Sequence, residues 1–102
     1  MDITRHAYKR AKERCGLNKK ALNHLLPIAI EKGLKQGECK GSLSKWVTKV
    51  YFAYRNGTNM RIYGEYLFIC DDRKLITIYL VPNDLKKSVK YIMEKRDKRS
   101  IG

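Results

Sequence analysis

Apolar residues recur with two different periods along this chain of 102 residues. Before Asn56-Gly57, and again after Pro82, they recur every three or four positions, which is typical of amphipathic helices. Between these points the period is two, which is typical of strands. The pattern predicts helices over about 5–15, 18–34, 42–56 and 84–96, and strands over about 60–63, 66–70 and 75–81.

Local signals define the ends of the predicted helices and strands. Thr4 is a favourable N-cap for the first helix, and Gly16 can end it. Asn18 is a favourable N-cap for the second helix. Within that helix, Pro27 lacks an N–H group and should kink the helix or divide it in two.

Gly64-Glu65 and Asp71–Lys74 join the three strands by tight turns, so the strands should form an antiparallel meander. The predicted fold class is therefore α+β: N-terminal helices, then a three-stranded antiparallel meander, then a basic C-terminal helix. A chain of this length corresponds to a single domain over residues 1–102.

Alternation along the strands predicts two different sheet faces. An aliphatic face, which must pack on helices, carries Met60, Ile62, Leu67, Ile69, Ile76, Ile78 and Leu80. The other face mixes aromatic and hydroxyl groups with one arginine and carries Arg61, Tyr63, Tyr66, Phe68, Cys70, Thr77 and Tyr79. This second face fits a second core layer and fits equally a surface on which bases stack.

The charge is unusual for a globular protein. The 23 Lys and Arg residues exceed the 10 Asp and Glu residues, so the net charge is +13. The surplus is +5 in residues 1–20, +3 in 21–49, zero in 50–85 and +5 in 86–102. A surplus of this size, concentrated at the two ends, indicates a polyanionic partner, most simply nucleic acid. An acidic protein or an anionic membrane surface also fits the charge alone.

Cys15, Cys39 and Cys70 are an odd number of cysteines without C-x-x-C spacing, which does not indicate a disulfide framework. A zinc site would also need His6 or His24 at irregular spacing, so we expect no metal and no other cofactor. No apolar run approaches the roughly 20 residues that span a bilayer, and no apolar signal segment is seen. These features favour a cytoplasmic protein without a membrane partner.

The first predicted helix carries two kinds of basic residue. Ala7, Ala11 and Cys15 form its apolar stripe, and Arg10 and Arg14 lie roughly 60° and 20° from Ala7, at the border of that stripe. The far side of the helix carries Arg5, Lys9 and Lys12. A guanidinium close to a core needs a partner. That partner could be a phosphate or a structural carboxylate, for instance from Asp71, Asp72 or Glu65.

His6 precedes Arg10 by one helical turn and can transfer protons near neutral pH. RNA cleavage through the 2′-hydroxyl needs a base, an acid and positive charge on the phosphate. His6, a nearby tyrosine and one or two arginines would supply that set. A single histidine is also often structural, and both interpretations of His6 stay open. His24 is expected to be structural or exposed.

The run His6-Ala7 with Arg10 and Arg14, followed by Gly16-Leu17-Asn18, resembles the H-A-x-x-R-x-x-x-R start of a family of small phage and bacterial domains. That family is grouped with the RelE/barnase-like (BECR) ribonuclease fold. Its final strand is similar to Ile76-Thr77-Ile78-Tyr79 of this chain. The resemblance implies an RNase-like cleft between the first helix and the sheet. It places the site at His6, Arg10, Arg14, Thr77 and Tyr79.

The first hypothesis is thus an RNA-directed protein of RelE/barnase-like fold that acts as a metal-independent endoribonuclease toxin, for which a protein antitoxin is an expected partner. His6 would transfer protons, Arg10, Arg14 and Arg61 would bind phosphate, and Tyr79 or Tyr63 would assist or stack. Nucleic acid would also be held by Thr77 and by Lys9, Lys12, Lys45, Lys49, Lys86, Lys87 and Lys90.

Two other hypotheses explain the charge without catalysis. The protein could be a phage or mobile-element protein that inhibits a host nucleic-acid machine, for example a defence system, by occupying its RNA, its DNA or its nucleic-acid groove. It could also be an interaction module for an acidic protein. The sequence leaves open whether the protein is an enzyme.

Overall fold

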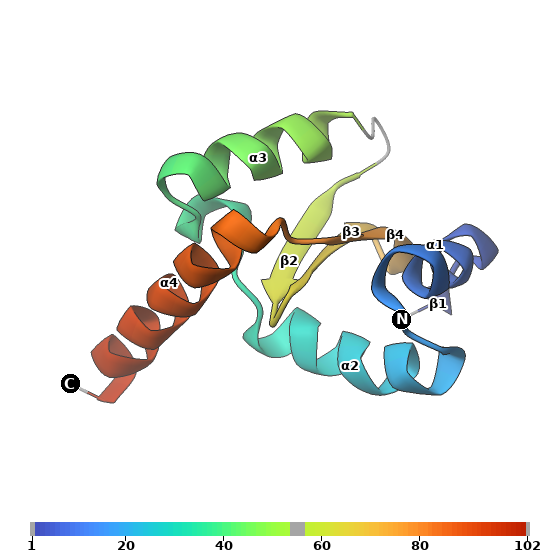
Figure 1. Cartoon of the computed structure of the whole chain (residues 1–102). Helices are drawn as coiled ribbons and strands as arrows, with labels where there is room; N and C mark the ends of the chain where they lie inside the picture. The colour runs from blue at the N-terminus through green and yellow to red at the C-terminus, as the bar shows by residue number, and fades with distance from the viewer. Residues whose placement is uncertain (1, 54–56, 102) are drawn as a thin grey trace.

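The computed structural model describes residues 2–53 and 57–101, with side chains up to Asp97. The described residues form four α-helices, a short 3₁₀ helix η1 and one sheet (Figure 1). In chain order the elements are β1 (Asp2–Ile3), α1 (Arg5–Cys15), α2 (Lys19–Lys32), η1 (Gln36–Glu38), α3 (Gly41–Phe52), β2 (Asn59–Tyr63), β3 (Tyr66–Asp71), β4 (Lys74–Leu80) and α4 (Asn83–Ile101). The predicted α+β class is confirmed.

The sheet has the strand order β1-β4-β3-β2. Strands β2, β3 and β4 form the predicted antiparallel meander. The prediction of only three strands is wrong, because β1 pairs in parallel with β4 and makes the sheet mixed. A strand of two residues is too short to show alternation, and its partner Lys74-Leu75 lies about seventy positions away in the sequence.

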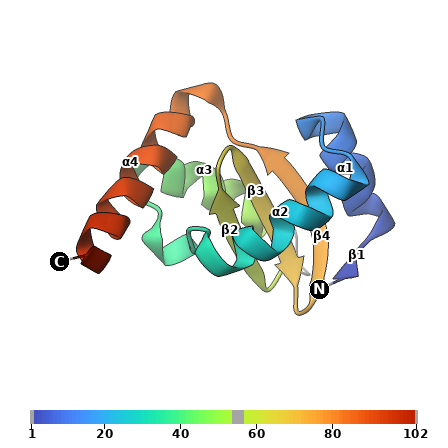
Figure 2. The same ribbon diagram turned by 90° about the horizontal axis from the view of Figure 1, so that it is seen from below.

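Helices cover both faces of the sheet (Figures 1 and 2). On one face, α3 and the start of α4 enclose a core that includes Leu43, Val47, Ile62, Leu67 and Val89. On the other face, α1 and α2 enclose a second core that includes Ala7, Leu22, Leu26, Phe68 and Cys70. The aromatic face is therefore a second core layer and not an open surface for bases.

The predicted division of the strands into faces is right for β2 and β3 but wrong for β4. Ile78 lies opposite Phe68, and Tyr79 lies opposite Leu67. Opposed residues of an antiparallel pair share a face, so Ile78 belongs with the aromatic residues and Tyr79 with the aliphatic ones. Alternation holds from Thr77 to Leu80, but a register shift between Ile69 and Cys70 places Leu75 on the same face as Ile78. The register of β4 against β3, which alternation within one strand does not define, decides which face each residue occupies.

The helix boundaries follow the local signals closely. Thr4 and Asn18 cap α1 and α2 by accepting from the amides of Ala7 and Ala21, and Gly16 ends α1 at a positive φ of 67°. Helix α2 is not divided at Pro27; it runs to Lys32 with Pro27 on its exposed side. Helix α3 ends at Phe52, and its predicted residues 54–56 lie outside the described residues. Helix α4 is longer than predicted.

Among the described residues, no helix combines the length and the apolar character that crossing a bilayer requires.

Candidate nucleic-acid interface

Helix α1 lies beside the edge of the sheet, next to β1 and β4 (Figures 1 and 2). Strand β1 pairs with only the first two residues of β4, Lys74 and Leu75. At the junction of β1 and α1, the Thr4 hydroxyl donates to the Leu75 carbonyl at 3.0 Å. In the last turn of α1, Arg14 Nη1 donates to the Ile78 carbonyl at 3.3 Å. Arg14 thus covers an edge carbonyl that would otherwise be open to pairing with another chain.

Arg14 and Tyr79, two of the predicted site residues, are in contact. The Arg14 Cζ atom lies 4.2 Å from the centroid of the Tyr79 ring, within the range of a cation–π interaction. Both side chains are half-buried, as the position of Arg14 at the border of the apolar stripe predicted. The Arg14 guanidinium is therefore held by a carbonyl and an aromatic ring of the protein itself.

His6 and Arg10 also lie together, on the outer surface of α1. Arg10 Nε lies 3.5 Å from His6 Nε2, and Arg10 Nη1 lies 3.0 Å from a carboxylate oxygen of Glu13. The carboxylate partner of Arg10 is thus on its own helix, whereas the sequence interpretation considered Asp71, Asp72 and Glu65. A single ion pair at such an exposed position contributes little to stability.

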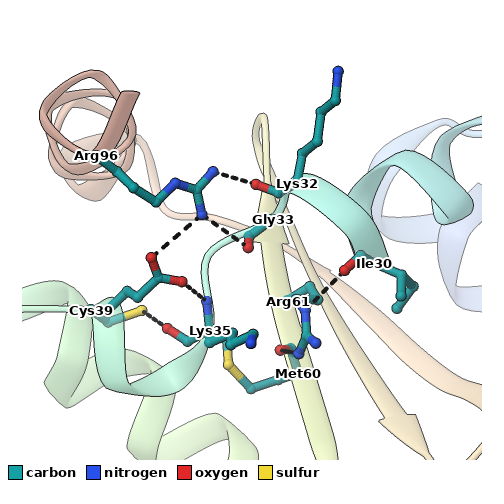
Figure 3. A network of polar contacts seen from close by, with 9 residues as sticks. Ile30, Lys32, Gly33, Lys35, Cys39, Met60, Arg61 and Arg96 are labelled. Carbon is teal, nitrogen blue, oxygen red and sulfur yellow. Dashed lines mark hydrogen bonds and ion pairs between the residues drawn. The ribbon is translucent and has the colours of Figure 1, made fainter. Parts of the chain in front are cut away.

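Arg61 points into the face of the sheet that α2 covers, because its β2 position lies opposite Phe68. Arg61 Nε donates to the Ile30 carbonyl in the last turn of α2 at 3.2 Å, and Nη1 donates to the Met60 carbonyl at 2.8 Å and to Asn59 Oδ1 (Figure 3). Arg61 and Tyr79 therefore project from opposite faces of the sheet, and β3 separates their strands.

Two further predicted site residues of the sheet are enclosed to different extents. Tyr63 is partly buried against the core under α1 and α2. Thr77 has no exposed surface, and its hydroxyl has no hydrogen-bond partner among the described residues. The Thr77 side chain therefore lies in the core and does not form part of a surface.

The predicted binding lysines are distributed over three helices. Lys9 and Lys12 are exposed on α1, Lys45 and Lys49 on α3, and Lys87 and Lys90 on α4. Lys86 lies 3.4 Å from a carboxylate oxygen of Glu65, and Lys9 lies 4.0 Å from one of Glu13.

A cleft of about 300 Å³ lies between α4 and η1. It is lined by Gly37, Glu38, Lys40, Tyr91, Ile92, Lys95 and Arg96. Tyr91 at its border is 58% exposed, and Lys95 Nζ lies 4.8 Å from the centroid of the Tyr91 ring. None of these residues was predicted as a site residue. The spacing of Lys87, Tyr91 and Lys95, four residues apart on one helix side, was the signal in the sequence that could have found them.

Arg96 fixes the position of α4 against the end of α2 (Figure 3). Its Nη1 donates to the Gly33 carbonyl at 3.3 Å and lies 3.5 Å from Glu38 Oε2, and its Nη2 donates to the Lys32 carbonyl. The other oxygen of Glu38 accepts from the Lys35 amide at 2.9 Å. These bonds neutralise the C-terminal end of α2 and hold one wall of the cleft in place.

The three cysteine thiols have low reactivity at neutral pH. Burial raises the pKa of Cys15, Cys39 and Cys70 from 9.0 to about 11 in each case, and the nearby Arg14 lowers the pKa of Cys15 only in part. Thiols with such pKa values stay protonated at neutral pH and are poor nucleophiles and poor metal ligands. The described part of the chain holds no group of three or more residues that could ligate a metal.

Comparison of the chain with protein-family models, with curated proteins and with solved structures found no match.

Proposed function

We propose that this protein binds nucleic acid, with RNA favoured, through the outer side of α4 and the cleft beside it, and that it does so without cleaving its ligand. The observation that carries the proposal is the state of Lys87, Lys90 and Lys95. All three are exposed, and no ion pair of the described residues includes them. Free ammonium groups on one helix attract phosphates and release condensed counterions when they bind them.

The rest of the helix surface strengthens this argument. The exposed Tyr91 ring lies among the free lysines, which is the combination of stacking surface and positive charge that nucleic-acid-binding proteins use. Helix α4 also extends away from the sheet, so its outer side is open to a large ligand (Figure 1). On α1, in contrast, Lys9 and Arg10 share the Glu13 carboxylate.

The distribution of the predicted catalytic residues supports binding without catalysis. His6 lies on α1, Arg61 faces α2, and Tyr79 projects from the other face of the sheet. The guanidinium groups of Arg14 and Arg61 already donate to protein carbonyls. General acid–base catalysis requires groups within hydrogen-bond reach of one reacting centre, and this arrangement offers no such shared centre in the part of the chain that the structure describes.

A metal-independent ribonuclease of RelE/barnase-like fold is the second candidate function. It is favoured by one specific contact, the approach of Arg10 to the exposed His6 ring. A histidine beside a guanidinium can exchange a proton next to a bound phosphate. Under this candidate the protein is a toxin, and a protein antitoxin is its expected partner.

The proposed binding activity corresponds to the hypothesis of a phage or mobile-element protein that acts in the cytoplasm. Such a protein inhibits a host nucleic-acid machine by occupying its RNA, its DNA or the groove that receives them. An acidic protein as the partner would use the same lysines. If the partner is an acidic protein and not RNA, we expect no binding to naked RNA, and a binding assay with labelled RNA distinguishes the two partners.

One assay separates the two candidate functions. Labelled single-stranded RNA is incubated in EDTA with the wild type and with His6→Ala. We expect equal binding by both proteins and no cleavage. Three or four phosphate contacts should weaken the affinity about 20- to 50-fold between 50 and 200 mM salt. Cleavage by the wild type that His6→Ala abolishes would establish the ribonuclease instead. Affinity that does not change with salt would contradict phosphate binding.

A further inference from the structure

Two surface clefts meet at Gly37, in the middle of η1. The first is the cleft between η1 and α4 described above. The second has a volume of about 330 Å³ and lies between η1, the end of α3 and the start of β2. It is lined by Lys35, Gln36, Gly37, Tyr51, Thr58, Asn59, Met60 and Arg61. Among the described residues, Gly37 alone lines both clefts.

We propose that the two clefts form one groove that binds single-stranded RNA, with consecutive nucleotides on the two sides of Gly37. This inference rests on the proposed function and specifies the form of the ligand. The lysines of α4 attract phosphates of any nucleic acid, whereas the groove selects strands whose bases are unpaired.

The first cleft offers a stacking surface and charge at the same point. Tyr91 presents its ring at the border of the cleft, with Lys95 4.8 Å from its centroid. A base that stacks on Tyr91 brings its own phosphate close to Lys95 and to the exposed Lys40. Each volume lies at the lower end of the range for small-molecule sites, which suits one nucleotide for each cleft.

The second cleft offers polar groups that can bond to the edge of a base, and two further cationic side chains. Lys35 is exposed, and Arg61 is a lining residue of the cleft. Arg61 uses Nε and Nη1 for protein acceptors, while Nη2 donates to no acceptor in the residues that the structure describes. Gln36 and Asn59 contribute amide groups, which can bond to the edges of unpaired bases.

The segment that lines both clefts is bonded to the rest of the protein at both of its ends. Leu34 and Ile62 exchange two backbone hydrogen bonds, of 2.7 and 2.9 Å, and so tie the start of this segment to β2. The Glu38 contacts with Lys35 and Arg96 tie its other end to α4. A groove with fixed walls loses little entropy when it binds a flexible strand.

A duplex lacks the feature that the groove recognises. In double-stranded RNA the bases are stacked on one another, so no base face is free to lie on Tyr91. Single strands expose their bases, and stacking on an aromatic side chain is tolerant of sequence. The proposed groove therefore distinguishes single strands from duplexes and is not expected to read a defined sequence through Tyr91.

Gly37 provides a direct test because its surroundings are empty. Apart from its two chain neighbours, no atom of the described residues lies within 4 Å of the position that a Cβ atom would take at Gly37, so larger residues fit there. Gly37→Glu places a carboxylate at the junction of the clefts. Gly37→Gln supplies the same bulk without the charge. Lys20→Gln, at the opposite end of α2, is the control for the loss of one unit of net charge.

The experiment measures fluorescence anisotropy with an unstructured RNA of about twelve nucleotides and with the same RNA annealed to its complement. Tyr91→Ala should weaken single-strand binding about 5- to 150-fold and leave duplex binding unchanged, because a stacked base contributes in that range. Tyr91→Phe should retain wild-type affinity. Gly37→Glu should weaken single-strand binding at least fivefold more than Gly37→Gln and Lys20→Gln do.

The outcomes separate this inference from the proposed function. If the wild type binds RNA but does not distinguish single strand from duplex, and Tyr91→Ala and Gly37→Glu behave like their controls, the groove is overturned and the proposed function stands. If the wild type binds neither form of RNA, both are overturned. Far-UV circular dichroism of each variant verifies that it has folded.

Discussion

Helices α1 and α4 are both strongly basic, yet the structure uses their charges differently. On α1, Arg14 donates to the Ile78 carbonyl and covers the Tyr79 ring, and Arg10 pairs with Glu13. On α4, Arg96 is bonded to the end of α2, whereas Lys87, Lys90 and Lys95 have no ion-pair partner among the described residues. Arg14 and Arg96 thus connect separate segments of the fold, whereas Lys87, Lys90 and Lys95 supply charge that no ion pair of the described residues neutralises.

The physical reason for this difference lies in the two side chains. A guanidinium is planar, has five N–H donors and is weakly hydrated, so it can satisfy several carbonyls at a half-buried position. An ammonium is strongly hydrated and stays in water. The number of basic residues on a helix therefore does not identify a binding surface. The fraction of them that the protein leaves unpaired is the informative quantity.

The sharpest test of the comparison is to reverse the charges on each helix in turn. Lys87, Lys90 and Lys95 replaced together by Glu should weaken RNA binding on the order of 100-fold, from about 1 kcal/mol for each lost phosphate contact. The matched variant replaces Arg5, Lys9 and Lys12 by Glu and should weaken it less than about fivefold, through long-range charge alone. Anisotropy titrations at one salt concentration measure the RNA affinity of both triple variants. Equal losses would show that α1 and α4 bind alike.

A second test concerns stability and not binding. Arg14→Met removes the bond to the Ile78 carbonyl and the contact with Tyr79, and should lower the free energy of unfolding by about 1–2 kcal/mol. Lys12→Met, on the exposed side of the same helix, should change it by less than about 0.5 kcal/mol. Urea denaturation followed by circular dichroism measures both. RNA affinity lost by Arg14→Met at unchanged stability would assign Arg14 to the interface.

The salt dependence of binding distinguishes single lysines. Lys90→Gln should reduce the slope of log affinity against log salt by about 0.7, the value for one phosphate contact with a single strand. Lys12→Gln should leave the slope as it is in the wild type. Titrations at four or more salt concentrations give these slopes. A slope that falls for Lys12→Gln would extend the interface to α1.

The smallest expected effect concerns the Glu13 carboxylate, which pairs with Lys9 and Arg10. Glu13→Gln frees both cations and should lower the free energy of unfolding by less than about 1 kcal/mol, because both pairs are exposed. RNA affinity should rise less than about twofold. Parallel denaturation and anisotropy measurements test this. A large rise in affinity would mean that α1 is a binding surface that Glu13 suppresses.

Much of the fold could be predicted because its signals are local. Thr4, Gly16 and Asn18 define helix ends through bonds within a few residues, and the predicted α1 boundaries are those observed. The turns between β2, β3 and β4 are likewise local, so the meander was predictable. Of the two effects predicted for Pro27, division of the helix did not occur: α2 is continuous and is stabilised by its packed side, where Leu22, Leu26 and Ala29 are buried.

The candidate site was less predictable because it depends on distant contacts. Arg10, Arg14, Arg61 and Tyr79 were grouped from residue type and a family resemblance. The structure brings Arg14 to Tyr79 but places Arg61 on the opposite face. Arg96 received no prediction, and its partners Lys32 and Gly33 lie more than sixty positions away. No local pattern carries information over such separations.

By itself, the sequence determined the periodicity of the helices and of β2 and β3, the caps, the turns and the uneven distribution of a net charge of +13. These properties follow from interactions within a few residues and from simple counting. Only the tertiary structure decided that β1 joins the sheet, that both faces are covered, and that Tyr79 and Ile78 lie on the faces opposite to those expected. It also decided which cations are free. Strand register and the partners of a guanidinium depend on chain segments that meet only when the protein folds.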